Sequence, residues 1–312
     1  MMTRIADLVS DALSEHLPRD ITIRANWIDV TKHELADARQ STVLITLAGM
    51  ATVLLFGGVI HPLLRFPEFG AHFDLTYGLA TLGFVIIWLV PLTALLIGTT
   101  AITRERESGR LRVLLGLPIT RRDVLIGKLL GRSILVGVIV LVGLTVSGGV
   151  LWQYYQGFIL STYALFAGLT VTFGLVFVWI GIGISAFFQS TARAMGTSVS
   201  VFALLVFLWN FVPKGAFYLV HGQYPENVPP PWDPPTWLIF LGNVNPTNSF
   251  LSLFNAWSPQ VSINRLGRYH QYSGDGPAPL FLQPEFLLLT MLLWGIIPVL
   301  LGARRFSRSD LG

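Results

Sequence analysis

Six stretches of the chain are apolar for long enough to cross a membrane, and this pattern most constrains the fold. A helix needs about 20 apolar residues to span the hydrocarbon core of a bilayer. We therefore predict an all-α integral membrane protein with six transmembrane helices, near residues 42–63, 79–102, 129–152, 160–188, 195–220 and 284–303. The fourth stretch is rich in glycine, which favours close packing between helices.

The composition supports a membrane protein. Only 12% of the residues are charged and 53% are hydrophobic, whereas a soluble domain carries about 25% charged residues. The chain has no cysteine, so disulfides, thiolate metal sites and thiol catalysis are excluded. The first apolar stretch begins near Ser41, behind a charged segment, and we therefore expect no cleavable signal peptide.

Lysine and arginine are distributed unevenly between the two sides of the predicted membrane. With six spans, 17 of the 21 lie on the side of the N-terminus. Arg65, Arg265 and Arg268 lie on the opposite side, and Lys214 lies within a predicted span. Segments that stay in the cytoplasm are enriched in lysine and arginine. We therefore predict a multi-pass protein of the cell membrane with both termini in the cytoplasm.

Residues 1–40 form a polar N-terminal region that we expect to be helical in two pieces. An apolar stripe at helical spacing marks the first piece: Ile5, Leu8, Val9, Ala12, Leu13 and Leu17. The second piece covers 23–40 and runs directly into the first span. Both pieces are predicted to lie along the membrane surface as amphipathic helices, and a small soluble helical pair is the alternative. The six-span domain then covers 41–303, and a cytoplasmic tail covers 304–312.

The connection between the fifth and sixth spans, residues 221–283, is long and rich in proline. It holds ten of the 18 prolines, so it cannot be one regular helix. Its apolar runs favour short helices at 236–241 and 247–257 that dip into the outer membrane face as re-entrant elements. A small folded external cap is the competing interpretation.

The most informative polar segment is 103–128, between the second and third spans. Four residues at i, i+3, i+4 and i+7 spacing predict a short helix with an apolar edge: Leu111, Leu114, Leu115 and Pro118. Gly109 permits a tight turn before this helix. Thr120 and Asp123 have capping-box spacing, which predicts that the next helix begins near Arg121 and projects below the membrane.

We interpret 103–128 as a docking surface on the inner membrane face for a separate protein. The alternative is a basic loop that is retained inside and contacts anionic headgroups. That alternative explains the arginines. It does not explain Glu105 and Glu107 beside them, nor the apolar edge between Gly109 and Pro118.

The pattern E-x-E-x-G-x-L-x-x-L-L-x-x-P-I-T-R-x-D-V-L-x-G-K, from Glu105 to Lys128, resembles the signature of ABC-2 type transporter permeases. The six spans, the amphipathic segment Lys32–Arg39 and the Asn245–Pro246 pair extend the resemblance over nearly the whole chain. One departure is that Gly109 and Leu111 are followed by Arg110 and Arg112, where the family usually has threonine and glutamate. This makes the docking surface more basic.

The resemblance implies that 103–128 holds a coupling helix that docks on a cytoplasmic ATPase. The implied docking residues are Glu105, Glu107, Gly109, Leu111, Leu114, Leu115, Pro118 and Arg121. The expected anchors at the membrane interface are Arg122, Lys128, Trp152 and Tyr155. The resemblance further implies two ATPase copies that use ATP and Mg²⁺, a second permease copy in a homodimer or heterodimer, and contact with membrane lipids. It implies neither a cofactor bound by this chain, nor enzymatic activity, nor a nucleic-acid partner.

Two features that the sequence lacks agree with an energy source outside this chain. The chain lacks the phosphate loop G-x-x-x-x-G-K-[ST], and no acidic residue lies deep within a predicted span, where proton-coupled carriers place such groups. Asn210 and Lys214 are candidates for a polar substrate path, although Lys214 can also reach the outer interface by snorkelling. No histidines have metal-ligand spacing.

A second function remains open from the sequence: a multispan membrane enzyme, or a membrane anchor, with its chemistry in 221–283. That region contains the titratable residues His221, Asp233, His270 and Asp275, but in no recognisable arrangement. The substrate is not encoded in any motif, and the family resemblance favours export.

Overall fold

The described residues of a computed structural model, 27–66, 73–116, 119–228, 234–258, 261, 263 and 279–308, form helices and no strand. Within this part of the chain, six helical segments are long and apolar enough to cross a membrane. They are α3 (Thr42–Arg65), α4 (Leu75–Glu107), α6 (Arg121–Tyr154), α7 (Leu160–Phe187), α8 (Thr191–Phe202) with its π-helical continuation η2 (Ala203–Leu208), and α12 (Pro284–Arg308). The predicted six-span fold is confirmed.

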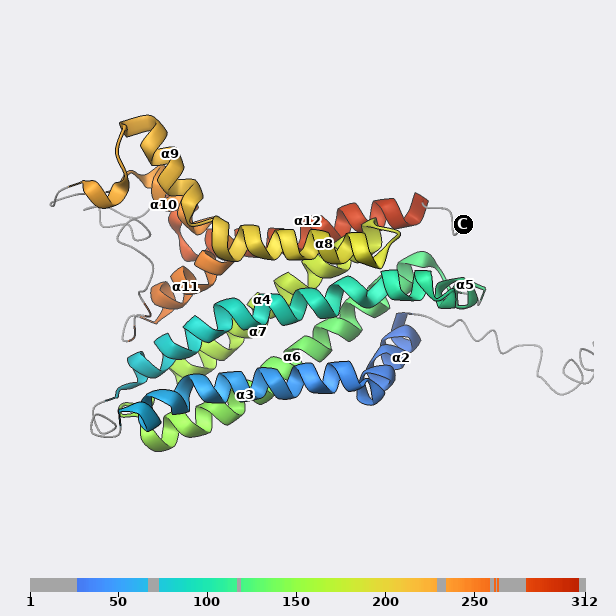
Figure 1. The fold of residues 1–312 in the computed structure, drawn as a ribbon, viewed down its shortest axis with the longest axis horizontal. Coiled ribbons are helices and arrows are strands. Elements are labelled where there is room, and N and C mark those ends of the chain that lie inside the picture. Colours follow the sequence, from blue (N-terminus) through green and yellow to red (C-terminus); the bar gives the residue numbers. More distant parts are fainter. Residues whose placement is uncertain are drawn as a thin grey trace, which may run out of the picture.

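The helix α7 lies at the centre of the bundle and packs against α4, α6 and α12. In Figure 1, α3 forms one edge, α8 and α12 form the opposite edge, and α4, α6 and α7 lie between them. The α4–α7 contact is close because glycines face each other. A Cβ atom on Gly181 would lie 2.9 Å from the carbonyl oxygen of Leu95 and 3.0 Å from the Cα atom of Gly98. The predicted role of glycine in this span is thus confirmed at this crossing.

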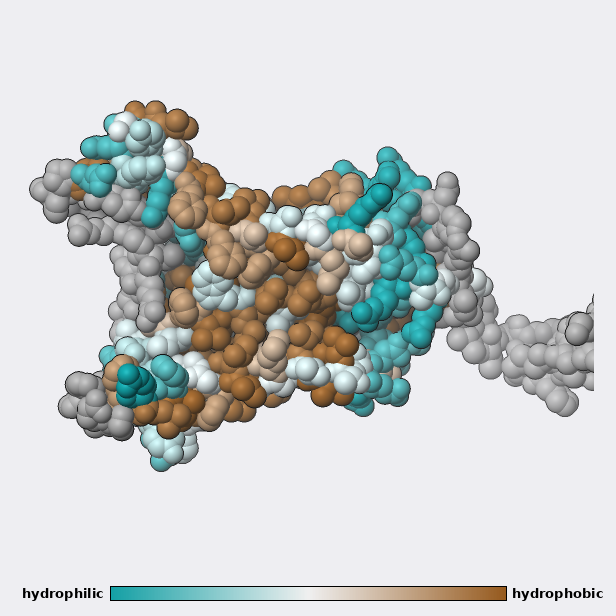
Figure 2. Space-filling model, in the orientation of Figure 1, coloured by the Kyte–Doolittle hydropathy of each residue, from teal (hydrophilic) through white to brown (hydrophobic). Residues whose placement is uncertain are grey.

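On the face shown in Figure 2, the surface is largely hydrophilic at one end and hydrophobic in the middle, and the other end has patches of both kinds. The hydrophilic end contains α2 (Trp27–Gln40), the short helix α5 (Arg110–Leu115) and the C-terminal end of α12 (Figure 1). We call this the basic end. The second span is longer than predicted, because α4 continues as a regular helix beyond its apolar stretch into this end. The predicted start of the following helix near Arg121 is confirmed by α6.

The fifth span is shorter than predicted. Its helix does not continue from 195 to 220 but ends at Leu208, and after a turn at Trp209 and Asn210 a separate helix, α9 (Phe211–His221), leaves the line of α8 (Figure 1). Pro213 explains this break, because it lacks the N–H that would bond to the carbonyl of Trp209 and its ring clashes with that carbonyl. Hydropathy alone does not register the break, since both sides of it are apolar.

The two short helices predicted between the fifth and sixth spans are confirmed as α10 (Thr236–Asn243) and α11 (Pro246–Trp257). The two have different surroundings. α11 is largely buried and packs against α7 and α12, whereas Leu238 of α10 forms a small separate cluster with Phe217 of α9. Two 3₁₀ turns, η3 (Pro225–Asn227) and η5 (Leu280–Leu282), complete the described connections.

The predicted N-terminal helix at 23–40 is confirmed from Trp27 onwards as α2, which packs against α6. The apolar stripe from Ile5 to Leu17 lies outside the described residues. So do Asp233, His270 and Asp275, three of the titratable residues considered for an enzymatic site.

The close α4–α7 crossing can be tested with a valine. Gly181→Val should lower the stability of the folded protein by about 1–3 kcal/mol, because the added side chain overpacks the helix crossing. The measurement is the melting temperature of the detergent-purified protein, followed by size-exclusion chromatography. Gly168→Val is the matched control, since nothing lies within 4 Å of a Cβ atom at that position of the same helix. Equal melting temperatures for the two variants would contradict a tight contact.

Candidate functional site

The candidate site is the corner at the basic end where α4 turns through α5 into α6. α4 ends at Glu107, Ser108 caps it, and Gly109 has a φ of 74°. This left-handed conformation is open to glycine without steric cost, so the chain can reverse direction directly before α5. The prediction of a tight turn at Gly109 is confirmed.

The start of α6 is capped as predicted. The Thr120 side chain accepts a hydrogen bond from the backbone N–H of Asp123 (3.2 Å), and the Asp123 carboxylate accepts one from the backbone N–H of Thr120 (3.1 Å). This capping box stabilises the first turn and begins α6 at Arg121. Pro118, predicted to end the preceding helix, lies outside the described residues.

The apolar edge of α5 faces the protein itself. Leu111 is only 1% exposed and belongs to the main core, and Leu114 packs against that core. In this structure the two side chains attach α5 to the bundle, and their predicted contact with a partner stays a prediction. The side chain of Leu115 is not among those that the structure describes.

Apart from Gly116, the exposed residues of the corner whose side chains the structure describes are polar. They are Arg104, Glu107, Ser108, Arg110, Thr120 and Arg122. Glu107 also accepts a hydrogen bond from the backbone N–H of Thr191 (2.7 Å), at the start of α8. We call these six residues the corner surface.

Two arginines connect the corner to the end of α12. Arg106 donates to the carbonyl of Phe188 (3.0 Å), and Arg121 donates to the carbonyl of Phe306 (2.7 Å). Both guanidinium groups also lie over the Phe306 ring, at 5.5 and 5.8 Å from its centroid. The sequence prediction assigned Arg121 to the docking surface. The structure shows it joining α6 to α12, and the role of Phe306 had no signal in the sequence.

A buried ion cluster of Glu34, Glu105, Lys128 and Arg132 holds the corner together. Lys128 is 1% exposed, and its ammonium group lies 2.5 Å from Glu34 Oε1 and 2.6 Å from Glu105 Oε1. Arg132 Nε lies 2.8 Å from Glu34 Oε2. The four charges balance, and they join α2, α4 and α6 at a single point.

Close packing of α2 on α6 brings the cluster together. A Cβ atom on Gly131 would lie 2.8 Å from Glu34 Cβ, so only glycine allows this approach. Burial by itself would raise the pKa of the Glu34 carboxyl, but the charges of Lys128 and Arg132 and the hydrogen bond from Lys128 outweigh it. The pKa of Glu34 therefore lies below its ordinary value, and the carboxylate is ionised at neutral pH.

Two residues predicted as interface anchors are buried instead. Lys128 does not face headgroups, because the two carboxylates of the ion cluster provide its charge with partners inside the protein. Tyr155 is 5% exposed, and its hydroxyl donates to the carbonyl of Val59 (2.7 Å), which ties the end of α6 to α3. Arg122 and Trp152 are exposed, and their anchoring role stays a prediction.

The two polar residues proposed for a substrate path lie at the far end of the fifth span. Asn210 is exposed in the turn after η2, and Lys214 is half-buried in α9. They do not belong to the corner, and their role in transport stays a prediction.

Asn245 has a structural role that its sequence context did not define. It is fully buried, its side-chain oxygen caps α11 by accepting from the N–H of Thr247 (2.8 Å), and its side-chain amide donates to the carbonyl of Leu205 (2.8 Å). Leu205 lies in the π-helical segment η2, where the regular helix hydrogen bonds are interrupted. Asn245 thus links the start of α11 to the irregular part of the fifth span.

Among the residues that the structure describes, no group of three His, Cys, Asp or Glu side chains could hold a metal ion. His221, the one titratable residue of the proposed enzymatic set that is described, stacks on Phe217 at 4.1 Å between ring centroids.

Comparisons with known proteins match this chain to transport proteins. The family model described as "ABC-2 family transporter protein" matches residues 17–311. The "Probable ABC transporter permease protein NosY" of Stutzerimonas stutzeri is 26% identical over 297 residues, which is 90% of this chain and 97% of that protein. A protein of the same name from Pseudomonas aeruginosa is 24% identical over 230 residues, 71% of this chain and 78% of its own length.

Removing the charge of Lys128 tests the ion cluster. Lys128→Met should cost about 3–5 kcal/mol, because it leaves buried carboxylates without their counter-charge. Thermal melting of the purified protein measures this loss. Lys32→Met, an exposed lysine on α2, is the control, and the double variant Lys128→Met/Glu105→Gln, which keeps the Glu34–Arg132 pair, should recover part of the stability. If Lys128→Met melted like Lys32→Met, the ion cluster would not stabilise the fold.

Proposed function

This chain belongs to the ABC-2 transporter family, and we propose that it uses the corner surface to receive the force of a cytoplasmic ATPase that drives export. It is a multi-pass membrane protein and a permease of an ABC transporter. Permeases of this family are not themselves catalytic, and ATP hydrolysis belongs to a separate subunit. The enzyme alternative raised from 221–283 therefore has no support.

The observation that carries this proposal is that α4 and α6 are joined to each other at the basic end through the ion cluster, in which Glu105 of α4 contacts Lys128 of α6. Both helices extend beyond their apolar stretches, and the described parts of the corner are held by the turn at Gly109, the cap at Thr120 and the burial of Leu111. A surface mounted on two helices that cross the membrane moves with them. Force applied there reaches the spans with little loss to bending.

The corner surface differs from the docking set expected from the sequence. Its exposed residues are charged or hydroxyl-bearing, while Leu111 and Leu114 hold α5 in place from behind. Opposite charges across an interface fix its register and speed association. We infer that the ATPase reads the pattern of Arg104, Glu107 and Arg110, and that the two leucines make the surface rigid.

Contacts from the corner reach four other elements, so a displacement there is shared. Glu107 bonds to the start of α8, and Arg121 bonds to the end of α12. Arg106 bonds to the residue after α7, and Glu105 reaches α2 through Lys128. In the proposed mechanism, closure of the ATPase subunits tilts these elements together.

The remaining features of the proposal follow the family. The chain pairs with a second permease copy, and two ATPase subunits use ATP and Mg²⁺ on the cytoplasmic side. The basic end, with α2, α5 and the end of α12, faces the cytoplasm of the cell, in agreement with the distribution of lysine and arginine. The two relatives named as probable ABC transporter permeases support the assignment to a permease.

The orientation can be tested by cysteine labelling, because the natural chain has no cysteine. Arg65→Cys places a thiol at the end of α3 away from the basic end, and Arg110→Cys places one on the corner surface. A membrane-impermeant maleimide should label Arg65→Cys in spheroplasts and should label Arg110→Cys only after permeabilisation. The reverse pattern would overturn the proposed orientation.

Docking can be tested with the same background. Ser108→Cys and Arg110→Cys should each cross-link, through a short thiol–amine reagent, to an ATPase subunit co-expressed from the same gene neighbourhood. Arg65→Cys should not cross-link. If the ATPase co-purified with the permease but neither corner variant cross-linked, the subunits would associate elsewhere and the docking assignment would be wrong.

A further inference from the structure

A pocket of about 780 Å³ lies at the basic end, beside the corner. Its walls come from the junction of α2 and α3, from α4, α6 and α8, and from the turn before α5. Pockets of this size bind drug-sized ligands in other proteins.

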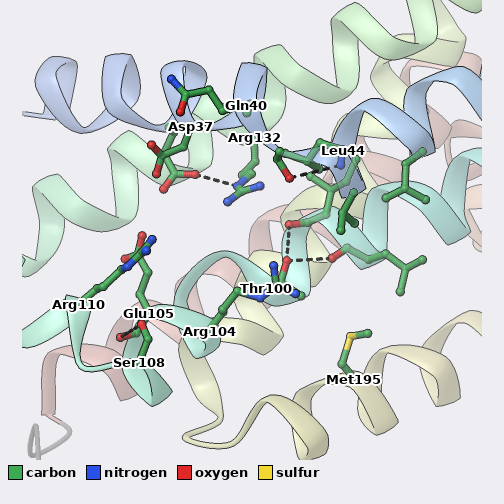
Figure 3. Close-up of a pocket in the computed structure, with 17 residues that line it drawn as sticks. Asp37, Gln40, Leu44, Thr100, Arg104, Glu105, Ser108, Arg110, Arg132 and Met195 are labelled. Atoms are coloured by element: carbon green, nitrogen blue, oxygen red, sulfur yellow. Dashed lines mark hydrogen bonds and ion pairs between the residues drawn. The ribbon is translucent and has the colours of Figure 1, made fainter.

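The pocket has one polar and one apolar side. In Figure 3, Glu105, Ser108 and Arg110 lie together, Asp37 lies on the same side but beside Gln40, and Met195 lies at the opposite side. The apolar lining residues are Val43, Leu44, Leu47, Leu96, Ile97 and Met195. A ligand that fills this pocket must therefore be amphiphilic.

The balance of charge on the polar side selects an anion. Glu34, Glu105 and Arg132 line the pocket but neutralise one another together with Lys128 in the buried ion cluster. Asp37 contacts only the imidazole of His33 on its own helix, at 3.3 Å, and contributes one negative charge. Arg104 and Arg110 contribute two positive charges, and neither forms an ion pair with any residue that the structure describes, so the excess charge on this side is positive.

The position of the pocket matches the boundary of a bilayer leaflet. Arg104 lies three residues before the end of α4, where the apolar part of the second span gives way to the polar corner. On the other wall, Ser41 caps the first turn of α3, and the apolar part of the first span begins there. Phosphate groups of lipids lie at this depth, and their acyl chains extend towards the bilayer centre.

We propose that this pocket binds an anionic phospholipid from the adjoining leaflet. Arg104 and Arg110 hold the phosphate by charge-assisted hydrogen bonds, and the first part of an acyl chain lies along Leu47, Leu96 and Met195. A free phosphate ion would leave the apolar side empty, and a neutral amphiphile would leave the arginines without a counter-charge.

The bound lipid would connect parts of the protein that otherwise touch little in this region. Its head would lie against the α4–α5 corner, and its chain would lie between α3 and α8. Occupancy would thus stabilise one position of the corner relative to α3. This inference rests on the membrane-spanning fold and holds without ATPase docking, although a bound lipid would occupy two arginines that the proposed ATPase contact also uses.

The test is lipid binding to the full chain, purified in a neutral detergent without an ATPase. Three probes separate the chemistry: dioleoyl phosphatidylglycerol, dioleoylglycerol, which lacks the phosphate, and glycerol 3-phosphate, which lacks the chains. Native mass spectrometry and thermal shift should both detect phosphatidylglycerol binding, and the two partial molecules should give no comparable signal.

Two variants address the two sides of the pocket. Arg104→Gln/Arg110→Gln should weaken phosphatidylglycerol binding at least tenfold, and Met195→Trp should weaken it by narrowing the apolar side without a change of charge. The matched control is Arg193→Gln/Arg304→Gln, which removes two exposed arginines outside the pocket and should bind like the natural protein.

Several outcomes would overturn the proposal. If dioleoylglycerol bound as well as phosphatidylglycerol, the pocket would recognise apolar chains and not the phosphate. If glycerol 3-phosphate bound as well as phosphatidylglycerol, the pocket would be a site for free anions. An equal loss in the control variant would mean that general surface charge attracts the lipid. Full binding by both pocket variants would place the lipid elsewhere.

Discussion

Lys128 is a buried cation between two carboxylates, and the arrangement of the basic end depends on it. Removing a charged group from water costs several kcal/mol unless a counter-charge is in place. Glu34 and Glu105 must therefore stay within hydrogen-bonding distance of the ammonium group, at 2.5 and 2.6 Å. Because these three residues come from α2, α6 and α4, the cost of separating them keeps the helices in register. An apolar contact would tolerate sliding that this cluster does not.

The same cluster explains why the corner can be polar outside and still rigid. Glu105 turns inward to Lys128, whereas Glu107 turns towards α8. These two glutamates of one motif thus make different contacts. On the inner side of α5, Leu111 fills the core. Charge and packing are therefore combined within the seven residues from Glu105 to Leu111, and this leaves Arg104 and Arg110 available for ligands or partners.

The features that sequence alone predicted are those set by local patterns. Spans follow from hydropathy, the turn at Gly109 from its conformational freedom, and the start of α6 from the Thr120–Asp123 spacing. The sequence alone places Lys128 at the membrane interface. It cannot predict the buried ion pair, because the partner Glu34 lies 94 residues away in the chain and no local pattern connects the two. The sequence predicts too long a fifth span, because apolar residues continue past Pro213. The helix ends earlier because proline cannot donate the backbone hydrogen bond that a continuous helix needs.

The π-helical segment η2 changes the direction in which side chains of the fifth span point. In its i to i+5 pattern, shown by the bond from the N–H of Trp209 to the carbonyl of Leu204, the helix holds one residue more than an α-helical path would. One residue corresponds to about 100° of rotation at 3.6 residues per turn. Side chains near the end of η2 are therefore offset by up to that angle from the faces that a helical wheel started at Thr191 would assign. The face that α8 exposes can be followed through η2 only after this rotation is included.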